Sequence, residues 1–202
     1  MEAAYLLALG FVVGLSGAMM PGPLLVYTIA ESMRRGWKTG FLVIVGHAAV
    51  EAALMAFILA GVGYMMTSET FVRLVSILGG VVMVHTAFGL AKSSWGKEAG
   101  RAEMRYGAVT GGILFTAFNP GLPIWWATAG ARLLLEGMRS AGLFGAFLVV
   151  VGHWLADLGW YLLVSVLISR GMAVAPYVGK VRALLSLALA AIGIYYLQSG
   201  FN

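Results

Sequence analysis

The sequence predicts an all-α membrane protein with six transmembrane helices, arranged as two inverted three-helix repeats whose first helices (the first and fourth of the chain) are broken. Three observations support this prediction. Of the 202 residues, 61% are hydrophobic and 10% are charged, which is too apolar for a soluble domain of this size. Long uncharged runs are separated by short basic breaks. Finally, motifs of the first half return in the second half.

Six apolar stretches are long enough to cross a bilayer core of roughly 30 Å as helices. They cover residues 3–33, 39–65, 70–91, 106–135, 141–168 and 180–198. The first stretch has no basic segment before it and runs well beyond the length of a signal-peptide core, so we expect it to be retained. All six belong to a single transmembrane domain, residues 1–202.

Proline motifs interrupt the first and fourth stretches. Residues 21–23 are Pro-Gly-Pro, and residues 119–123 are Asn-Pro-Gly-Leu-Pro. A proline lacks an N–H and its ring clashes with the preceding turn, so it breaks a helix and leaves a carbonyl without its donor. Broken helices form solute sites in transporters, although a kink that serves packing alone is the alternative. The carbonyls expected to be free are those of Gly17, Met19, Thr116 and Asn119.

The two breaks together suit a zwitterionic solute. The N-terminal end of each half-helix attracts a carboxylate, while free carbonyls and nearby acidic groups attract an ammonium group. The predicted solute-binding residues therefore surround the breaks: Gly17, Met19, Pro21, Gly22, Pro23, Thr116, Asn119, Pro120 and Pro123.

Two histidine–carboxylate pairs lie inside the predicted spans. His47 and Glu51 are four residues apart, as are His153 and Asp157, so each pair shares one helix face. Ionisable groups are costly inside a membrane and usually face a cavity or a partner. We interpret all four as proton-coupling or cation-binding residues. The alternative is a structural role in which each histidine satisfies its own carboxylate and pins two helices.

These pairs are part of an internal repeat. We assign residues 1–91 to repeat 1, residues 92–105 to a hydrophilic linker and residues 106–202 to repeat 2. Because each repeat has an odd number of spans, the two copies are expected in opposite orientations. The positions matched at a spacing of 106 residues are Gly36 and Gly142, Gly46 and Gly152, His47 and His153, and Glu51 and Asp157, while Pro21 and Pro120 match at 99.

The basic residues predict the orientation. Ten of the 13 Lys and Arg residues fall in alternate breaks, which places those breaks in the cytoplasm and both termini outside it. The net charge of +5 is therefore explained by topology, and no nucleic-acid partner is expected. The chain has no cysteine, which excludes disulfides and thiolate chemistry.

Three motifs occur in order along the chain: Gly17-Ala18-Met19-Met20-Pro21-Gly22-Pro23, a later Gly36-x-x-x-Gly40, and Asn119-Pro120. They resemble those of the lysine exporter (LysE/RhtB) family, and the resemblance covers nearly the whole chain. The resemblance implies a prokaryotic cell-membrane exporter of amino acids that is driven by an ion gradient, has no covalent cofactor and is not an enzyme. The family commonly has a lysine where this chain has Gly121, and the histidine–carboxylate pairs are not associated with its amino-acid exporters. Both differences make the site less cationic and favour a cationic substrate.

Two further functions stay open. A divalent metal-ion exporter would use His47, Glu51, His153 and Asp157 as a shared ligand set, which requires the four side chains to converge within a few ångströms. In addition, Gly14-Leu15-Ser16-Gly17 resembles the nucleophile motif of rhomboid intramembrane proteases, and this function requires Ser16 within hydrogen-bond reach of a histidine.

Aromatic and small residues add two expectations. We interpret Trp125 and Trp126 as packing or membrane-interface residues, with stacking on a ligand as the alternative. Gly10-x-x-x-Gly14 and Gly36-x-x-x-Gly40 favour close helix contacts. Whether these contacts lie within one chain or join the chains of a homo-oligomer stays open.

Overall fold

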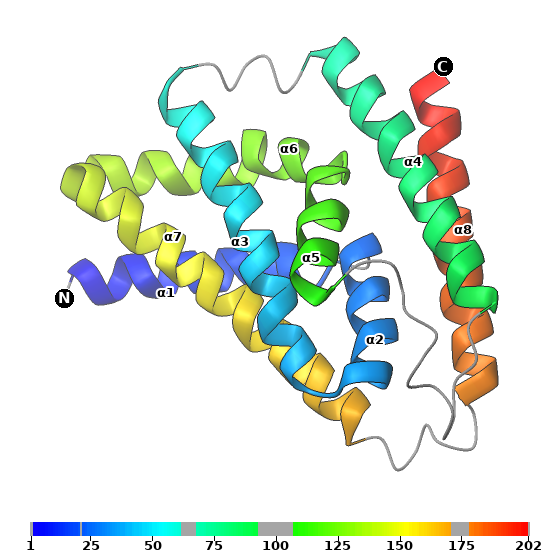
Figure 1. The fold of residues 1–202 in the computed structure, drawn as a ribbon. Helices are drawn as coiled ribbons and strands as arrows, with labels where there is room; N and C mark the ends of the chain where they lie inside the picture. Colours follow the sequence, from blue (N-terminus) through cyan, green and yellow to red (C-terminus); the bar gives the residue numbers. More distant parts are fainter. Residues whose placement is uncertain (1, 21, 62–67, 93–106, 171–177, 202) are drawn as a thin grey trace.

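The computed structural model describes residues 2–20, 22–61, 68–92, 107–170 and 178–201, and all elements in these ranges are helical. Among the described residues, four helices are long and apolar enough to cross a membrane, or five if the bent pair Glu2–Ala18 and Pro23–Arg35 forms one span. An all-α membrane protein is confirmed. The elements are α1 (Glu2–Ala18), α2 (Pro23–Arg35), α3 (Lys38–Leu59), α4 (Glu69–Lys92), α5 (Ala108–Ala117), α6 (Gly121–Trp125), the π-helical turn η2 (Trp126–Gly130), α7 (Ala131–Ser169) and α8 (Val178–Phe201) (Figure 1).

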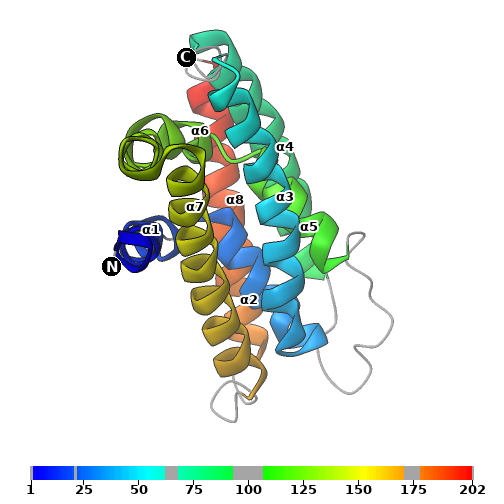
Figure 2. The same cartoon turned by 90° about the vertical axis from the view of Figure 1, so that its left-hand side faces the viewer.

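The first predicted span is broken, as expected. α1 ends at Ala18, α2 begins at Pro23, and the two helix axes differ by 82°. Pro23 suits the start of a helix, where its missing N–H needs no partner. Figure 2 shows α1 end-on beside the upright α2, so the two half-helices run across each other. Pro21 lies outside the described residues, as does most of the predicted linker.

The fourth predicted span is also broken, because α5 ends at Ala117 and α6 begins at Gly121. One continuous helical segment then follows, made of α6, η2 and the first part of α7. The fourth span was predicted to end at residue 135, but this segment continues to the sharp reversal at Ala141 and Gly142. Gly142 has a φ of 60°, which makes a two-residue reversal possible and leaves residues 136–140 helical.

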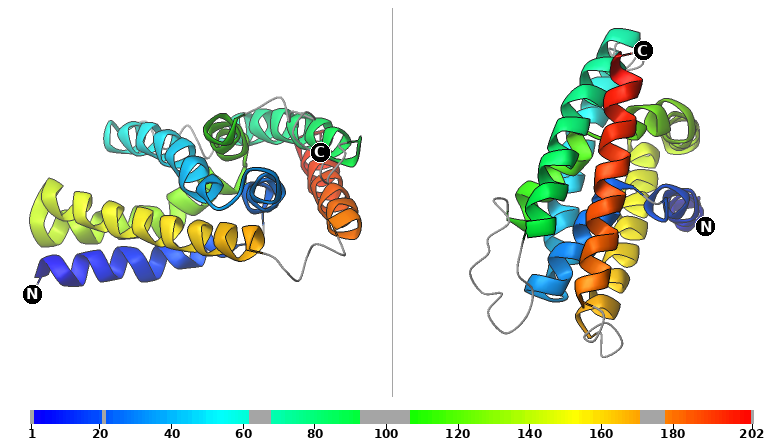
Figure 3. Two further views of the ribbon diagram at one scale, coloured as in Figure 1. Left: turned by 60° about the horizontal axis from the view of Figure 1, so that its bottom comes forward. Right: turned by 90° about the vertical axis from the view of Figure 1, so that its right-hand side faces the viewer.

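Two apolar clusters fill the interior. One contains Tyr27 and Phe115, whose rings stack at 4.7 Å between α2 and α5, and the other contains Leu6, Trp126 and Val149. α4 and α8 lie along each other and reach α2 and α5 (Figure 3). Because lipid tails are as apolar as these side chains, close packing and buried hydrogen bonds stabilise such a bundle more than hydrophobic burial does.

Glycines permit α1 to cross α7 closely. Gly10 lies against the backbone of Val149, and Gly152 lies against the backbone of Leu7. A Cβ atom at either glycine would come closer than 3.0 Å to a backbone carbonyl oxygen, so a larger residue would separate the helices. Gly14 also faces α7. The contact of the Gly10-x-x-x-Gly14 motif is therefore within a single chain.

The same crossing occurs between α5 and α3. Gly112 lies against the backbone of Val43, and Gly46 lies against the backbone of Val109. Val43 and Gly46 of α3 precede Val149 and Gly152 of α7 by 106 residues. Gly112 and Val109 of α5 follow Gly10 and Leu7 of α1 by 102 residues. The first helix of each half therefore packs in the same way on the helix of the other half that carries a histidine–carboxylate pair.

The turns before those two helices also match. Gly36 precedes α3 with a φ of 83°, and Gly142 precedes the second part of α7 with a φ of 60°. This left-handed conformation favours glycine at both positions. The glycine matches seen in the sequence thus correspond to matched backbone geometry.

Candidate cation and solute site

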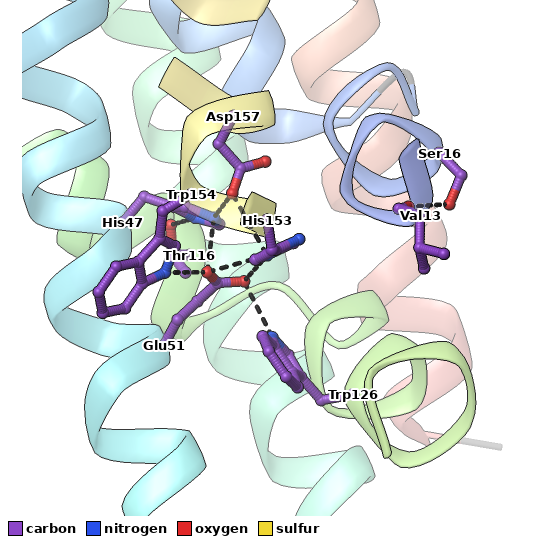
Figure 4. Close-up of polar contacts among 9 residues, drawn as sticks. All are labelled: Val13, Ser16, His47, Glu51, Thr116, Trp126, His153, Trp154 and Asp157. Atoms are coloured by element: carbon purple, nitrogen blue, oxygen red, sulfur yellow. Dashed lines mark hydrogen bonds and ion pairs between the residues drawn. The ribbon is translucent and has the colours of Figure 1, made fainter. Parts of the chain in front are cut away.

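Two histidines and two carboxylates converge in the interior, and we call them the tetrad. α3 carries His47 and Glu51, and α7 carries His153 and Asp157 (Figure 4). One ligand atom of each lies within 4.8 Å of the other three, and no tetrad residue is more than 8% exposed. The four residues therefore meet the spacing that a shared site requires.

Each histidine contacts both carboxylates. The Nε2 atom of His47 lies 3.3 Å from Glu51 and 3.5 Å from Asp157. The Nε2 atom of His153 lies 3.2 Å from Glu51 and 3.3 Å from Asp157. Each histidine therefore pairs both with its own carboxylate and with that of the other helix, and these contacts join α3 to α7.

Two tryptophans hold the Glu51 carboxylate. The indole N–H of Trp126 donates to Oε1 at 2.9 Å, and that of Trp154 donates to Oε2 at 3.0 Å. An indole can only donate, so both oxygens act as acceptors. Trp126 opens the π-helical turn, where Gly130 leaves room for its ring, and π turns often occur at functional sites. Our interpretation of Trp126 as a packing or interface residue missed this contact.

The two histidines have different surroundings. The Nδ1 atom of His47 lies 2.9 Å from the Thr116 hydroxyl of α5. The Nδ1 atom of His153 faces Gly14 instead and has no hydrogen-bond partner among the described residues, while Trp125 stacks on its ring at 4.9 Å. Thr116 follows Gly14 by 102 residues, the spacing of the matched crossings, so the two halves differ at equivalent positions.

A cavity of about 140 Å³ joins the tetrad to both breaks. Trp125, Tyr161 and Tyr196 are among the other residues of its walls, and no sequence pattern pointed to the two tyrosines. Met19, Pro120 and Pro123 are not among the lining residues, and Pro21 lies outside the described part of the chain. The predicted solute-binding residues that line the cavity are Gly17, Gly22, Pro23, Thr116 and Asn119.

The prediction of free carbonyls at the breaks is wrong for three of the four. The carbonyl of Gly17 accepts from the N–H of Met20 at 3.1 Å, and that of Thr116 accepts from the N–H of Asn119 at 3.1 Å. The Asn119 carbonyl accepts from Leu122 at 3.0 Å. Tight turns with hydrogen bonds between residues i and i+3 therefore replace the helical bonds that the prolines remove, and each oxygen keeps one lone pair for a further donor.

Ser16 is not part of the site. Its hydroxyl donates to the carbonyl of Val13 at 2.6 Å on an exposed face of α1, and the side chain points away from the tetrad (Figure 4). The hydrogen bonds of His47 and His153 in the structure do not involve it. This geometry contradicts the intramembrane protease alternative, which required a serine–histidine contact.

A sequence model of the LysE type translocators matches residues 15–200 of the chain. The comparisons with curated proteins and with solved structures gave no match. The matched range includes both breaks, the whole tetrad and the cavity that joins them.

Proposed function

Because the chain belongs to the LysE type translocator family, we propose that it is a secondary-active exporter of amino acids or related small amines in the cell membrane. The family places it among membrane translocators rather than enzymes. The observation that carries the proposal is the cavity of about 140 Å³ between the two breaks and the tetrad. Pockets for drug-sized ligands measure roughly 300–1,000 Å³, so this one suits a solute of few heavy atoms.

A small zwitterion matches the chemistry of the cavity walls. Its ammonium group would pair with Glu51 or Asp157, which are buried carboxylates. Its carboxylate would lie near Gly22 and Pro23, where the partly positive N-terminus of α2 faces the cavity. Trp125, whose ring stacks on His153, adds an apolar surface to the cavity wall. We expect a proton to be the coupling ion, exchanged against the solute by alternating access.

We further propose that residues 1–91 and 106–202 are inverted repeats of three spans each, with both termini outside the cytoplasm. The matched glycine crossings and the matched turns at Gly36 and Gly142 support the repeat, and the distribution of basic residues supports the orientation. The natural absence of cysteine provides the test. Glu2→Cys and Ser94→Cys should react with an impermeant maleimide from opposite sides of the membrane, and reaction from the same side would contradict the orientation.

The transport proposal is tested in proteoliposomes loaded with labelled amino acids or amines under an imposed proton gradient. We expect gradient-dependent flux that Glu51→Gln and Asp157→Asn abolish, while both variants elute as folded protein from size-exclusion chromatography. His85→Gln is the matched control, because His85 is an exposed histidine of α4 outside the tetrad. Absence of flux for every amino acid and amine, or full flux in both carboxylate variants, would refute the proposal.

A divalent metal ion is a second candidate solute. It is favoured by the convergence of four ligand atoms within 4.8 Å, the condition stated for this alternative. The same vesicles separate the two candidates: flux of Mn²⁺ or Cd²⁺ without any amino-acid or amine flux would replace the first proposal by the second.

A further inference from the structure

The tetrad offers two imidazole nitrogens and two carboxylates and no sulfur. We propose that it binds one first-row divalent transition-metal ion through His47, Glu51, His153 and Asp157. Imidazole together with carboxylate suits ions from Mn²⁺ to Zn²⁺, whereas Mg²⁺ and Ca²⁺ prefer oxygen ligands alone. This inference rests on the second candidate above and deepens it by naming the class of metal ion and its ligands. A bound ion would compete with the ammonium group of an amine for Glu51 and Asp157.

The spacing of the ligand atoms suits such an ion. The four histidine–carboxylate separations lie between 3.2 and 3.5 Å. Four ligands bound tetrahedrally at about 2.0–2.1 Å lie roughly 3.3–3.4 Å from one another. The remaining ligand atoms are no more than 4.8 Å apart. An ion would therefore reach all four groups through side-chain adjustment, without a movement of α3 against α7.

The charge of the tetrad also calls for a cation. Two carboxylates lie at 1% and 2% exposure, and buried charges are costly unless they are paired. Among the described residues their ion-pair partners are the two histidines, and no lysine or arginine takes part. The Oδ2 atom of Asp157 has no hydrogen-bond donor in this part of the chain and points between the histidines (Figure 4). A divalent ion would neutralise both carboxylates.

Neighbouring residues hold the ligands in place before an ion enters. The Thr116 hydroxyl, 2.9 Å from the Nδ1 atom of His47, can accept its proton and leave the Nε2 lone pair for the ion. Trp126 and Trp154 fix Glu51 from two sides. Such outer hydrogen bonds are typical of metal sites, and losing one usually weakens binding. We therefore assign Thr116, Trp126 and Trp154 as positioning residues.

Binding is tested on tag-free protein in detergent, stripped with a chelator and titrated calorimetrically with MnCl₂, CoCl₂ or ZnCl₂, with MgCl₂ as the comparison. We expect one transition-metal ion per chain and no binding of Mg²⁺. His47→Gln and Asp157→Asn should lower the affinity at least tenfold, whereas His85→Gln should bind like the unaltered chain. Thr116→Val and Trp126→Phe should keep one site with about 10–100-fold weaker affinity.

The inference is overturned by a lack of stoichiometric binding to the unaltered chain, or by the same affinity in His47→Gln and Asp157→Asn as in His85→Gln. A rise in the melting temperature of the unaltered chain with Co²⁺ but not with Mg²⁺ supports it without any variant, and equal melting temperatures with both ions contradict it. Because binding is measured in detergent, its failure leaves the export of amines standing, and a failure of amine export leaves the metal site standing.

Discussion

Gly46→Ala and Gly152→Ala should destabilise the fold and disturb the tetrad, because each glycine lies at a helix crossing and directly precedes a tetrad histidine. The new Cβ atom would come closer than 3.0 Å to a carbonyl oxygen of the opposite helix, whereas ordinary contacts begin at 3.4 Å. The obstacle is helix backbone, so the clash is relieved only by separating the helices by roughly 1 Å. Overpacking of this kind costs about 1–3 kcal/mol.

Thermal unfolding in detergent and calorimetric cation binding measure the two effects. A loss of about 1–3 kcal/mol lowers the melting temperature of a chain this size by roughly 2–12 °C. Cation affinity should fall at least tenfold, since His47 and His153 move with their helices. Gly89→Ala and Gly159→Ala are matched controls, because a Cβ there meets nothing within 4 Å. Alanine favours a helix over glycine by roughly 0.5–1 kcal/mol, so the controls should unfold at the same temperature or higher.

Equal melting temperatures for Gly46→Ala and Gly159→Ala would refute this reasoning, because the helices would then not approach as closely as described. A lower melting temperature in Gly152→Ala but not in Gly46→Ala would show that the two helix crossings are not equivalent. That result would remove the structural support for the repeat.

Three other predictions concern single side chains. Glu31→Gln should lower the free energy of unfolding by about 3 kcal/mol or less, measured by thermal unfolding, because Arg34 loses its buried partner at 2.9 Å. Tyr196→Phe should raise the KM for the solute up to about tenfold in the flux assay, because a hydrogen bond to the Asn119 side chain that shapes the cavity is worth about 0.5–1.5 kcal/mol. Ser16→Ala should leave flux unchanged, and loss of flux would contradict the exposed position of this hydroxyl.

The sequence predicted the two breaks because their cause is local. A proline removes its own N–H wherever it stands, so Pro23 and Pro120 mark a break without reference to the rest of the fold. The expectation that each histidine–carboxylate pair faces a cavity or a partner rests on the cost of ionisable groups in lipid, which also needs no knowledge of packing. Repetition of His47 and Glu51 in the second half then favoured a transport role for both pairs over a structural one.

Other features depend on contacts between distant elements, and the sequence could not supply them. No local pattern links Trp126 to Glu51, because this bond requires the π turn and the packing of η2 against α3. Trp154 directly follows a tetrad histidine, and this was the one signal that could have drawn attention to it. The carbonyl of Gly17 was expected to be free. Instead it accepts a hydrogen bond from the N–H of Met20 in a shorter turn, because an unpaired acceptor is costly in an apolar environment.

The hydrogen bonds of Glu51 join the two halves of the chain. Glu51 belongs to the first half and has His47 of that half 3.3 Å away, but it also accepts hydrogen bonds from Trp126, His153 and Trp154 of the second half. A movement of one half against the other must therefore break hydrogen bonds to a buried carboxylate, worth about 1.5–3 kcal/mol each. A cation in the tetrad competes for the same oxygens and changes that cost. Occupancy of the tetrad and the relative position of the halves are thus energetically coupled, which is the condition that alternating access imposes.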